Sequence, residues 1–330
     1  MFLGHSQIIS NLKILNITSE ILPYIPSASG VEVVGDSIFI VSDDSSQLFV
    51  LSSQGKPKFQ VELFKVEGEL DARISKKTKP DFEATSLITI ESSQHLVIFG
   101  SGSRESRQRG FLVKMPNSPQ EMQLPNFTVS EFSLKELYDS LRQNSEIAKS
   151  QDLNIEGATT TKDFFVFLHR SNKGGPNCLV IYERAEFEKW LSNSKQLPPL
   201  AVVCTCHLPM LNNIEAGFSG ASSFPNSNRI LFTASVEDSL NAYEDGVVLG
   251  SFIGTLEIPS PLKIPDLQIN TRSSKEVVFS NHREGDFNKV YKVESISILS
   301  MKEGGHYTAI AVTDNDQGQS TLLRIDFTEK

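Results

Sequence analysis

The chain is poor in cysteine, in basic residues relative to acidic ones, and in long apolar runs. Its three cysteines, Cys178, Cys204 and Cys206, include no Cys-x-x-Cys pair and cannot all be paired with one another. This favours plain core thiols in a reducing compartment. The longest apolar runs, such as 38–41 and 164–168, are far shorter than the roughly 20 residues that cross a bilayer. No membrane partner is therefore expected.

Positive charge is scarce. The sequence has 31 Lys and Arg residues against 40 Asp and Glu residues, which gives a formal net charge of −9. Nucleic acid is not the expected partner, because phosphate binding depends on dense Lys and Arg. The hydrophobic share of 39% and the charged share of 22% are typical of a soluble globular protein. A basic start and a long apolar stretch are missing near the N-terminus, which favours the cytoplasm; the periplasm remains open if a leader has been removed.

A short motif recurs five times along the chain. In each copy an apolar residue precedes a glutamate, and a small or apolar residue follows it. The five glutamates are Glu32, Glu83, Glu156, Glu215 and Glu294. Five units in 330 residues give 330/5 = 66 residues per unit. Repetition at such a spacing is typical of solenoids and propellers.

Each motif is followed by runs rich in Ile, Val and Phe that turn formers separate, the usual pattern of strands. In the first unit these runs are 38–41, 47–51 and 58–63, and the closing run of the fourth unit is expected at 275–280. The fifth unit ends one strand short. Residues 11–18 at the other end of the chain supply a candidate for the missing strand.

These units predict an all-β fold: a single β-propeller over residues 1–330, with five four-stranded blades and an N-terminal strand that closes the last blade. Six blades are the alternative, because residues 257–291 have room for extra strands. A helical insertion is expected at 133–148, between blades 2 and 3. Ser133 and Glu136 have the spacing of a capping box there, and Leu137 and Leu141 have helical spacing.

In a propeller, the start of each first strand and the loop after each second strand open on the same face. Two sets of polar residues should therefore converge at one mouth of the central channel. We expect the five motif glutamates to be metal ligands and His169, Asp43 and Arg170 to be catalytic. The expected ligand-binding residues are Asp44, Arg104, Lys173, Asp238, Asp314 and Asp316.

Clustered carboxylates either raise one another's pKa or recruit cations. Ca²⁺ is the expected ion, because it takes six to eight oxygen ligands and tolerates irregular geometry. Lys79 and Lys292 each stand near a motif glutamate and could neutralise part of the ring. A metal ion, a carboxylate or histidine base and basic side chains would suit hydrolysis of a small anionic phosphoester or carboxylic ester.

The motif set resembles an uncharacterised bacterial β-propeller family, itself distantly similar to the esterase-like phytase propellers. The segments that carry the resemblance are 28–32 with 41–45, 79–84, 153–158, 213–217, 245–250 and 292–294 with 312–314. The resemblance implies a propeller and, more loosely, Ca²⁺ at an acidic channel. It implies no established activity.

Two hypotheses follow. The protein is a metal-dependent hydrolase acting on a small anionic ester at the channel mouth. Alternatively, it is a non-catalytic propeller that binds a small molecule or a protein and uses the glutamates as structural pins. A monomer is favoured in both. The sequence identifies neither the substrate nor the metal.

Overall fold

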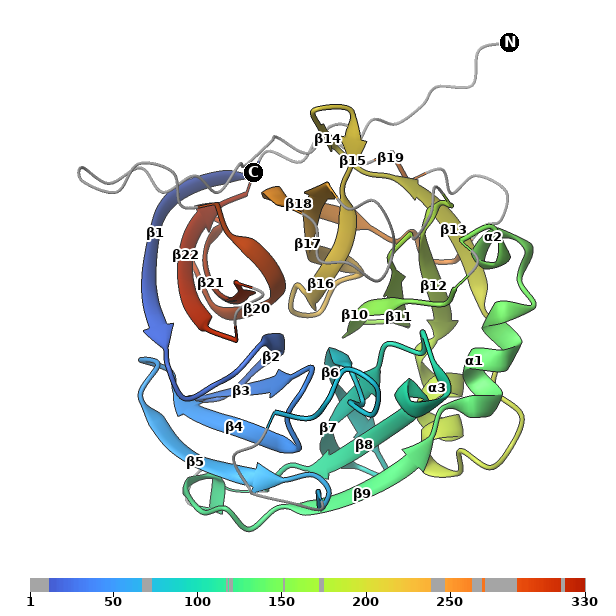
Figure 1. Cartoon of the computed structure of the whole chain (residues 1–330), viewed down its shortest axis with the longest axis horizontal. Coiled ribbons are helices and arrows are strands. Elements are labelled where there is room, and N and C mark those ends of the chain that lie inside the picture. Colours follow the sequence, from blue (N-terminus) through green and yellow to red (C-terminus); the bar gives the residue numbers. More distant parts are fainter. Residues whose placement is uncertain are drawn as a thin grey trace.

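The structure is a computed structural model and describes residues 12–66, 73–116, 118, 121–150, 152–171, 175–238, 247–262, 269–270, 290–315 and 318–329. The strands of the blades form five sheets arranged radially around a central axis, as Figure 1 shows. The five-bladed prediction is confirmed. Runs of Ile, Val and Phe form the strands, because β-branched and aromatic side chains pack well on the faces of a sheet that is covered on both sides.

Blades 1 and 2 are antiparallel sheets of four strands in sequence order. Blade 1 consists of β2 (Ala28–Val34), β3 (Ser37–Ser42), β4 (Gln47–Ser52) and β5 (Pro57–Glu62). Blade 2 consists of β6 (Phe82–Ile90), β7 (Ser93–Gly100), β8 (Arg109–Lys114) and β9 (Thr128–Ser133). The first strand of each blade lies innermost, next to the central axis (Figure 1).

Blades 3 and 4 depart from a plain four-stranded sheet. Blade 3 consists of β10 (Ile155–Thr160), β11 (Phe164–His169), β12 (Asn177–Glu183) and β13 (Val202–His207), and β19 (Ile269–Asn270) pairs in parallel with β13. Blade 4 consists of β16 (Gly217–Ser223), β17 (Arg229–Asp238) and β18 (Val247–Glu257). The fourth strand predicted at 275–280 lies outside the described residues. A separate hairpin, β14 (Met210–Leu211) with β15 (Ile214–Glu215), precedes blade 4.

Blade 5 joins the two ends of the chain. It consists of β20 (Lys292–Lys302), β21 (His306–Asp314), β22 (Ser320–Thr328) and, as its outer strand, β1 (Lys13–Leu22). β1 pairs antiparallel with β22 from Lys13 opposite Thr328 to Leu22 opposite Ser320. Figure 1 shows the two strands side by side in blue and red. The predicted N-terminal closure is confirmed, and backbone pairing in blade 5 joins the two ends of the chain.

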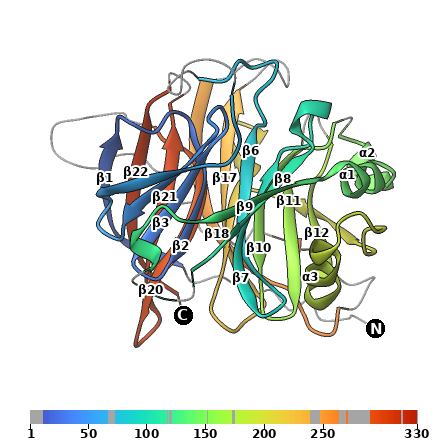
Figure 2. The same cartoon turned by 90° about the horizontal axis from the view of Figure 1, so that it is seen from below.

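The helices lie outside the blades. α1 (Lys135–Arg142) and α2 (Ser145–Ala148) follow β9, and α3 (Arg184–Ser192) follows β12 (Figure 2). The expected capping box does not form: Leu134 occupies the N-cap of α1, and Ser133 ends β9. Leu137, Tyr138 and Leu141 are buried in the core between blades 2 and 3. Two short 3₁₀ helices lie in connecting loops of blade 2: η1 (Glu105–Arg107) between β7 and β8, and η2 (Glu121–Gln123) between β8 and β9. Within the described ranges, none of the helices has the length and apolar character needed to cross a membrane.

The core lies between neighbouring blades. Between blades 1 and 2, for example, Phe39, Phe82 and Ile98 are at most 1% exposed. Burial of each such side chain contributes about 1.5–3 kcal/mol. Serine hydroxyls also connect the inner strands: Ser295 and Ser297 of β20 accept hydrogen bonds from the backbone N–H groups of Val31 and Val33 in β2. The inner strands therefore form a closed ring that fixes the side chains at the channel mouth.

Candidate functional site

Every inner strand carries a β-bulge near its start. Near this start, the pairing between the first and second strands of each blade skips one residue of the first strand, while the residues before and after it are paired. The skipped residues, in blade order, are Ser29, Glu83, Glu156, Ser219 and Glu294. A bulge redirects the side chain of its extra residue. The five blades therefore contribute three glutamates and two serines to the same position around the channel.

Two of the expected metal ligands, Glu215 and Glu32, do not lie at the bulge positions. Glu215 lies in β15, outside the inner strand of blade 4, where it is exposed and accepts a hydrogen bond from the Leu208 N–H at 2.8 Å. Glu32 lies three residues beyond the bulge of β2 and is 8% exposed. Ser297 donates a hydrogen bond to Glu32 Oε2 at 2.8 Å, and burial raises the pKa of Glu32 to about 7.

The two bulge serines hold the ring together. Ser29 donates a hydrogen bond to the Phe82 carbonyl, and Ser219 donates one to the Val293 carbonyl at 2.6 Å. Both carbonyls belong to the residue before a bulge glutamate. At two bulges, serine therefore makes the hydrogen bond between blades that the structural hypothesis assigned to the glutamates.

Two further rings of residues surround the bulge ring at the same mouth. Two positions before each bulge stand Ser27, Asp81, Asn154, Gly217 and Lys292. The other set comes from the second strands, from the last paired residue of each strand or the residue after it. In blade order these residues are Asp43, Ser101, Arg170, Ser235 and Asp314. Backbone bonds join neighbouring blades here: the Asp81 N–H donates to the Asp43 carbonyl at 3.1 Å, and the Ile155 N–H donates to the Ser101 carbonyl at 2.8 Å. The expected convergence of two polar sets is therefore present.

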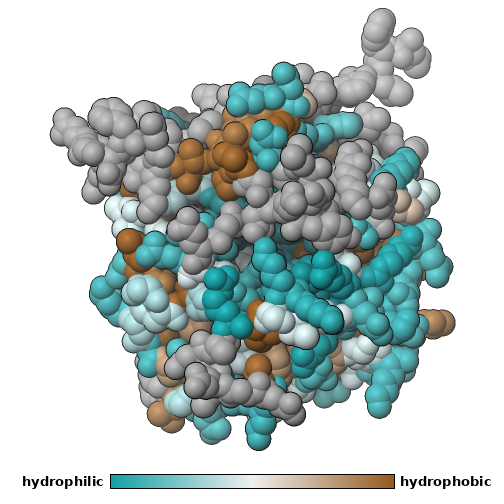
Figure 3. All heavy atoms as spheres, viewed as in Figure 1, coloured by the Kyte–Doolittle hydropathy of each residue, from teal (hydrophilic) through white to brown (hydrophobic). Residues whose placement is uncertain are grey.

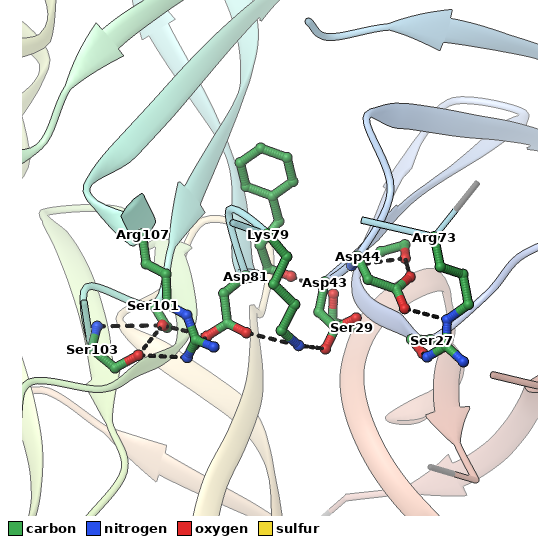
Figure 4. Close-up of polar contacts among 12 residues, drawn as sticks. Ser27, Ser29, Asp43, Asp44, Arg73, Lys79, Asp81, Ser101, Ser103 and Arg107 are labelled. Atoms are coloured by element: carbon green, nitrogen blue, oxygen red, sulfur yellow. Dashed lines mark hydrogen bonds and ion pairs between the residues drawn. The ribbon is translucent and has the colours of Figure 1, made fainter. Parts of the chain in front are cut away.

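Blades 1 and 2 contribute an acidic cluster made of Asp43, Asp81 and Glu83. One carboxylate oxygen from each of the three lies within 4.8 Å of the others. The Lys79 ammonium contacts Asp43 Oδ2 and lies 3.0 Å from Asp81 Oδ1 (Figure 4). Arg107 Nη1 lies 2.7 Å from Asp81 Oδ2 on the other side. Lys79 thus bridges a carboxylate of blade 1 and one of blade 2.

Two carboxylates of the acidic cluster have oxygens without a partner. Asp43 Oδ1 is buried and has no hydrogen-bond partner. Glu83 has neither a hydrogen bond nor an ion pair with the residues that the structure describes. Burial and then the neighbouring Glu156 and Asp81 raise the pKa of Glu83 well above its usual value. Burial also raises the pKa of Asp43, to about 6, although Lys79 opposes this. If all three carboxylates are ionised, the cluster therefore carries a formal charge of −3, which Lys79 and Arg107 compensate only in part.

Blades 3, 4 and 5 contribute an ion-pair network with different character. Arg170 Nη2 lies 2.6 Å from Glu237 Oε1, and Arg170 Nη1 lies 3.9 Å from Glu156 Oε2. Lys292 Nζ lies 3.5 Å from Glu237 Oε1 and 3.1 Å from Glu294 Oε1. A Cβ at Gly217 would lie 2.6 Å from Arg170 Nε. Because glycine has no side chain, the Arg170 side chain can pack directly against the backbone at this position.

The network affects its carboxylates unequally. Burial opposes the ionisation of Glu237, but Arg170 and Lys292 outweigh burial and lower the pKa of Glu237 to about 2. Burial raises the pKa of Glu294 to about 8, because Lys292 offsets only part of it. Glu156 also has a raised pKa from burial, although Arg170 opposes it. Two cations thus neutralise most of the charge of three carboxylates on this side of the mouth.

Several expected site residues lie elsewhere. His169 is 0% exposed, its ring Nε2 lies 3.4 Å from the Asp152 carbonyl, and burial lowers its pKa to about 4. In the structure it therefore cannot reach a ligand as a base. Arg104 and Asp238 are exposed, and the nearby Arg107 and Glu237 form ion pairs with Asp81 and Arg170 at the mouth.

The remaining expected residues have other positions. Asp44 is buried, accepts a hydrogen bond from Ser42 at 3.0 Å and forms an ion pair with Arg73 at 2.5 Å. Asp314 lies at the end of β21, opposite Lys292. Lys173 and Asp316 lie outside the described residues. Asp43, Arg170, Glu83, Glu156 and Glu294 are the expected residues that the structure brings together at the mouth.

Asp81, Arg107 and Glu237 are site residues that the sequence reasoning did not assign. Asp81 stands two residues before Glu83, as Lys292 does before Glu294, so the spacing could have identified it. Ser29 and Ser219 are each preceded by an apolar residue and followed by glycine, which was the signal for the two displaced bulges. Arg107 and Glu237 carry no comparable sequence signal.

Comparison with solved structures finds proteins of low sequence identity to this chain. Glutaminyl cyclase from Myxococcus xanthus is 10% identical, with a TM-score of 0.44 over 96% of this chain and 97% of that chain. The α-L-arabinanase from Cellvibrio cellulosa is 9% identical, with a TM-score of 0.42 over 95% of this chain and 92% of that chain. The tail fibre of Staphylococcus aureus phage P68 is 8% identical, with a TM-score of 0.45 over 98% of this chain and 54% of that chain.

No curated protein matches the sequence significantly. A family model described as a family of unknown function, DUF6929, matches residues 24–327, which is nearly the whole propeller. The chain therefore belongs to the family of unknown function DUF6929.

Proposed function

We propose that the protein binds a divalent cation at the channel mouth through Asp43, Asp81 and Glu83, and that this site serves the hydrolysis of a small anionic phosphoester or carboxylic ester. The observation that carries the proposal is the grouping of Asp43, Asp81 and Glu83, each of which offers one carboxylate oxygen within 4.8 Å of the other two. Two oxygens bound to one Ca²⁺ at about 2.4 Å are at most about 4.8 Å apart, so the three residues fit such an ion.

The charges favour a cation over a direct anionic ligand. Asp43, Asp81 and Glu83 carry a formal charge of −3 when ionised, and Lys79 and Arg107, which contact two of them, supply +2. An anion alone would meet repulsion at Glu83. A divalent ion would lower the raised pKa values of Asp43 and Glu83 and let both carboxylates ionise. Ca²⁺ is the ion that we propose, because all three donors are carboxylates.

A bound divalent cation would polarise an ester or phosphoryl oxygen. The protein supplies the remaining groups. Asp43 Oδ1 is the proposed proton acceptor, because it has no hydrogen-bond partner, while Asp43 Oδ2, which contacts Lys79, would be the oxygen that holds the ion. Arg107 and Lys79 are the positive groups next to the cluster that could contact an anionic ligand oxygen.

The alternative is a non-catalytic propeller whose carboxylates stabilise the ring. The ion-pair network favours it, since Glu156, Glu237 and Glu294 all face Arg170 or Lys292. The two hypotheses differ at the acidic cluster, where Glu83 has no such partner. The cluster therefore decides between them.

Calorimetric titration with Ca²⁺, Mg²⁺ and Mn²⁺ tests the cation site. The proposal expects one site per chain that Glu83→Gln weakens at least tenfold. Glu215→Gln is the matched control, because Glu215 is an exposed glutamate of the β15 hairpin, and it should bind as the unaltered protein does. Absence of binding by the unaltered protein, or equal effects of the two variants, would overturn the cation site.

Hydrolysis is tested separately with p-nitrophenyl phosphate, p-nitrophenyl acetate and a γ-lactone, each with Ca²⁺ and with EDTA. The proposal expects turnover of at least one substrate that EDTA abolishes and Asp43→Asn reduces at least a hundredfold. Cation binding without any turnover would support the non-catalytic alternative. Turnover that is unaffected by EDTA would contradict the assigned chemistry.

A further inference from the structure

Lys79 already places a positive charge inside the proposed cation site. Its side chain is 11% exposed, and its ammonium contacts Asp43 Oδ2 and lies 3.0 Å from Asp81 Oδ1. The backbone holds it there, because the Lys79 N–H donates to the Ser75 carbonyl at 2.9 Å and Pro80 restricts the backbone conformation of Lys79, the residue before it. The ammonium thus uses two of the three carboxylates that the cation would need.

The Lys79 ammonium does not contact every carboxylate oxygen of the acidic cluster. Asp43 Oδ1 is buried without a hydrogen-bond partner, and no hydrogen bond or ion pair reaches Glu83 from the described part of the chain. Lys79 also acts electrostatically on Glu83, yet the pKa of Glu83 remains well above its usual value. The site therefore holds one internal positive charge and has acceptor oxygens left over.

We propose that Lys79 determines the affinity of the site: its ammonium occupies the site in the absence of a divalent cation and leaves Asp43 when the cation binds. This inference rests on the proposed cation site. With Lys79 and Arg107 in place, a divalent cation changes the formal charge of the cluster from −1 to +1. Without Lys79, the same cation brings the charge from −2 to 0, which is the more favourable change.

The proposal predicts an order of affinities. Lys79→Met removes the internal competitor and should tighten Ca²⁺ binding at least tenfold in calorimetric titration. Lys79→Arg keeps the charge and can form two bonds to a carboxylate, so it should bind Ca²⁺ no more tightly than the unaltered protein. Lys114→Met is the matched control, because Lys114 is an exposed lysine at the end of β8, and it should change the affinity less than threefold.

A purely structural Lys79 gives a different result. Its removal would then lower the melting temperature and leave Ca²⁺ binding unchanged or weaker, and that outcome overturns the inference. Lys79→Gln is the second neutral variant if Lys79→Met does not fold. The two proposals fail separately: if the unaltered protein binds Ca²⁺ and neither neutral variant binds it more tightly, only the role of Lys79 is wrong. If neither the unaltered protein nor the variants bind Ca²⁺, the cation site itself is wrong.

Discussion

Arg170→Met should destabilise the protein, because Arg170 is the main counter-ion of two buried carboxylates. Its guanidinium lies 2.6 Å from Glu237 and 3.9 Å from Glu156, and all three side chains are at most 16% exposed. Removal of one partner from a buried ion pair costs about 3–5 kcal/mol. The lowering of the Glu237 pKa from 4.5 to about 2 corresponds to about 3 kcal/mol of stabilisation at neutral pH.

The cost translates into a measurable shift of the melting temperature. The entropy of unfolding is about 2.1 cal/mol/K per residue, or about 0.7 kcal/mol/K for 330 residues. A loss of about 3–5 kcal/mol therefore lowers the melting temperature by about 4–7 °C in calorimetry at pH 8. Lys149→Met is the control: it removes one charge of an exposed ion pair with Glu146 and should change the melting temperature by less than about 1 °C.

The pH dependence of stability tests whether the unpaired carboxylates cause the destabilisation by Arg170→Met. In the unaltered protein the low pKa of Glu237 provides stability that is complete above about pH 4.5 and is lost as the pH falls toward 2. Without Arg170, burial raises the pKa values of Glu237 and Glu156, so the variant loses stability as the pH rises above 4.5. The deficit should be larger at pH 8 than at pH 5, and addition of Glu237→Gln should recover at least half of it. Equal deficits at the two pH values would refute the reasoning.

Three further predictions concern the inner strands. Ser219→Ala removes the hydrogen bond to the Val293 carbonyl and should cost about 1–3 kcal/mol in urea unfolding; a change below 0.5 kcal/mol would show that the bulge serine does not pin the ring. Glu32 has a pKa raised to about 7, so it destabilises the fold as the pH rises through 7. Glu32→Gln should therefore be more stable than the unaltered protein at pH 8 by about 1–3 kcal/mol and nearly equal at pH 4.5, and a constant difference would contradict this assignment. Gly217→Ala places a Cβ 2.6 Å from Arg170 Nε and should cost about 1–3 kcal/mol, whereas an unchanged melting temperature would show that Arg170 can move freely.

The sequence was sufficient to predict the ring and its closure. Strand-forming runs separated by turns, five motifs and a missing last strand led to five blades and to β1 in blade 5, because each of these features is local or periodic. The propeller architecture also predicted that the polar loops meet on one side of the ring, because the start of each first strand and the loop after each second strand open on the same face. Asp43, Arg170 and three glutamates were found in this way.

The register of the inner strands was not predictable from the glutamate motif. Serine can occupy a bulge as glutamate does, so the copies containing Glu32 and Glu215 were shifted by three and four residues from the true positions Ser29 and Ser219. The choice between Arg104 and Arg107 depends on the 3₁₀ turn of η1, which returns Arg107 to Asp81. Such contacts depend on backbone conformation and packing between blades, which no single motif encodes.

The acidic channel mouth as a divalent-cation site is the central claim. A crystal structure of the protein grown with Mn²⁺ and measured at the manganese absorption edge tests it most directly. One anomalous peak within bonding distance of carboxylate oxygens of both Asp43 and Glu83, with the Lys79 ammonium moved away from Asp43, is the predicted result. A map with no peak at the mouth, and with Lys79 still between Asp43 and Asp81, would contradict it.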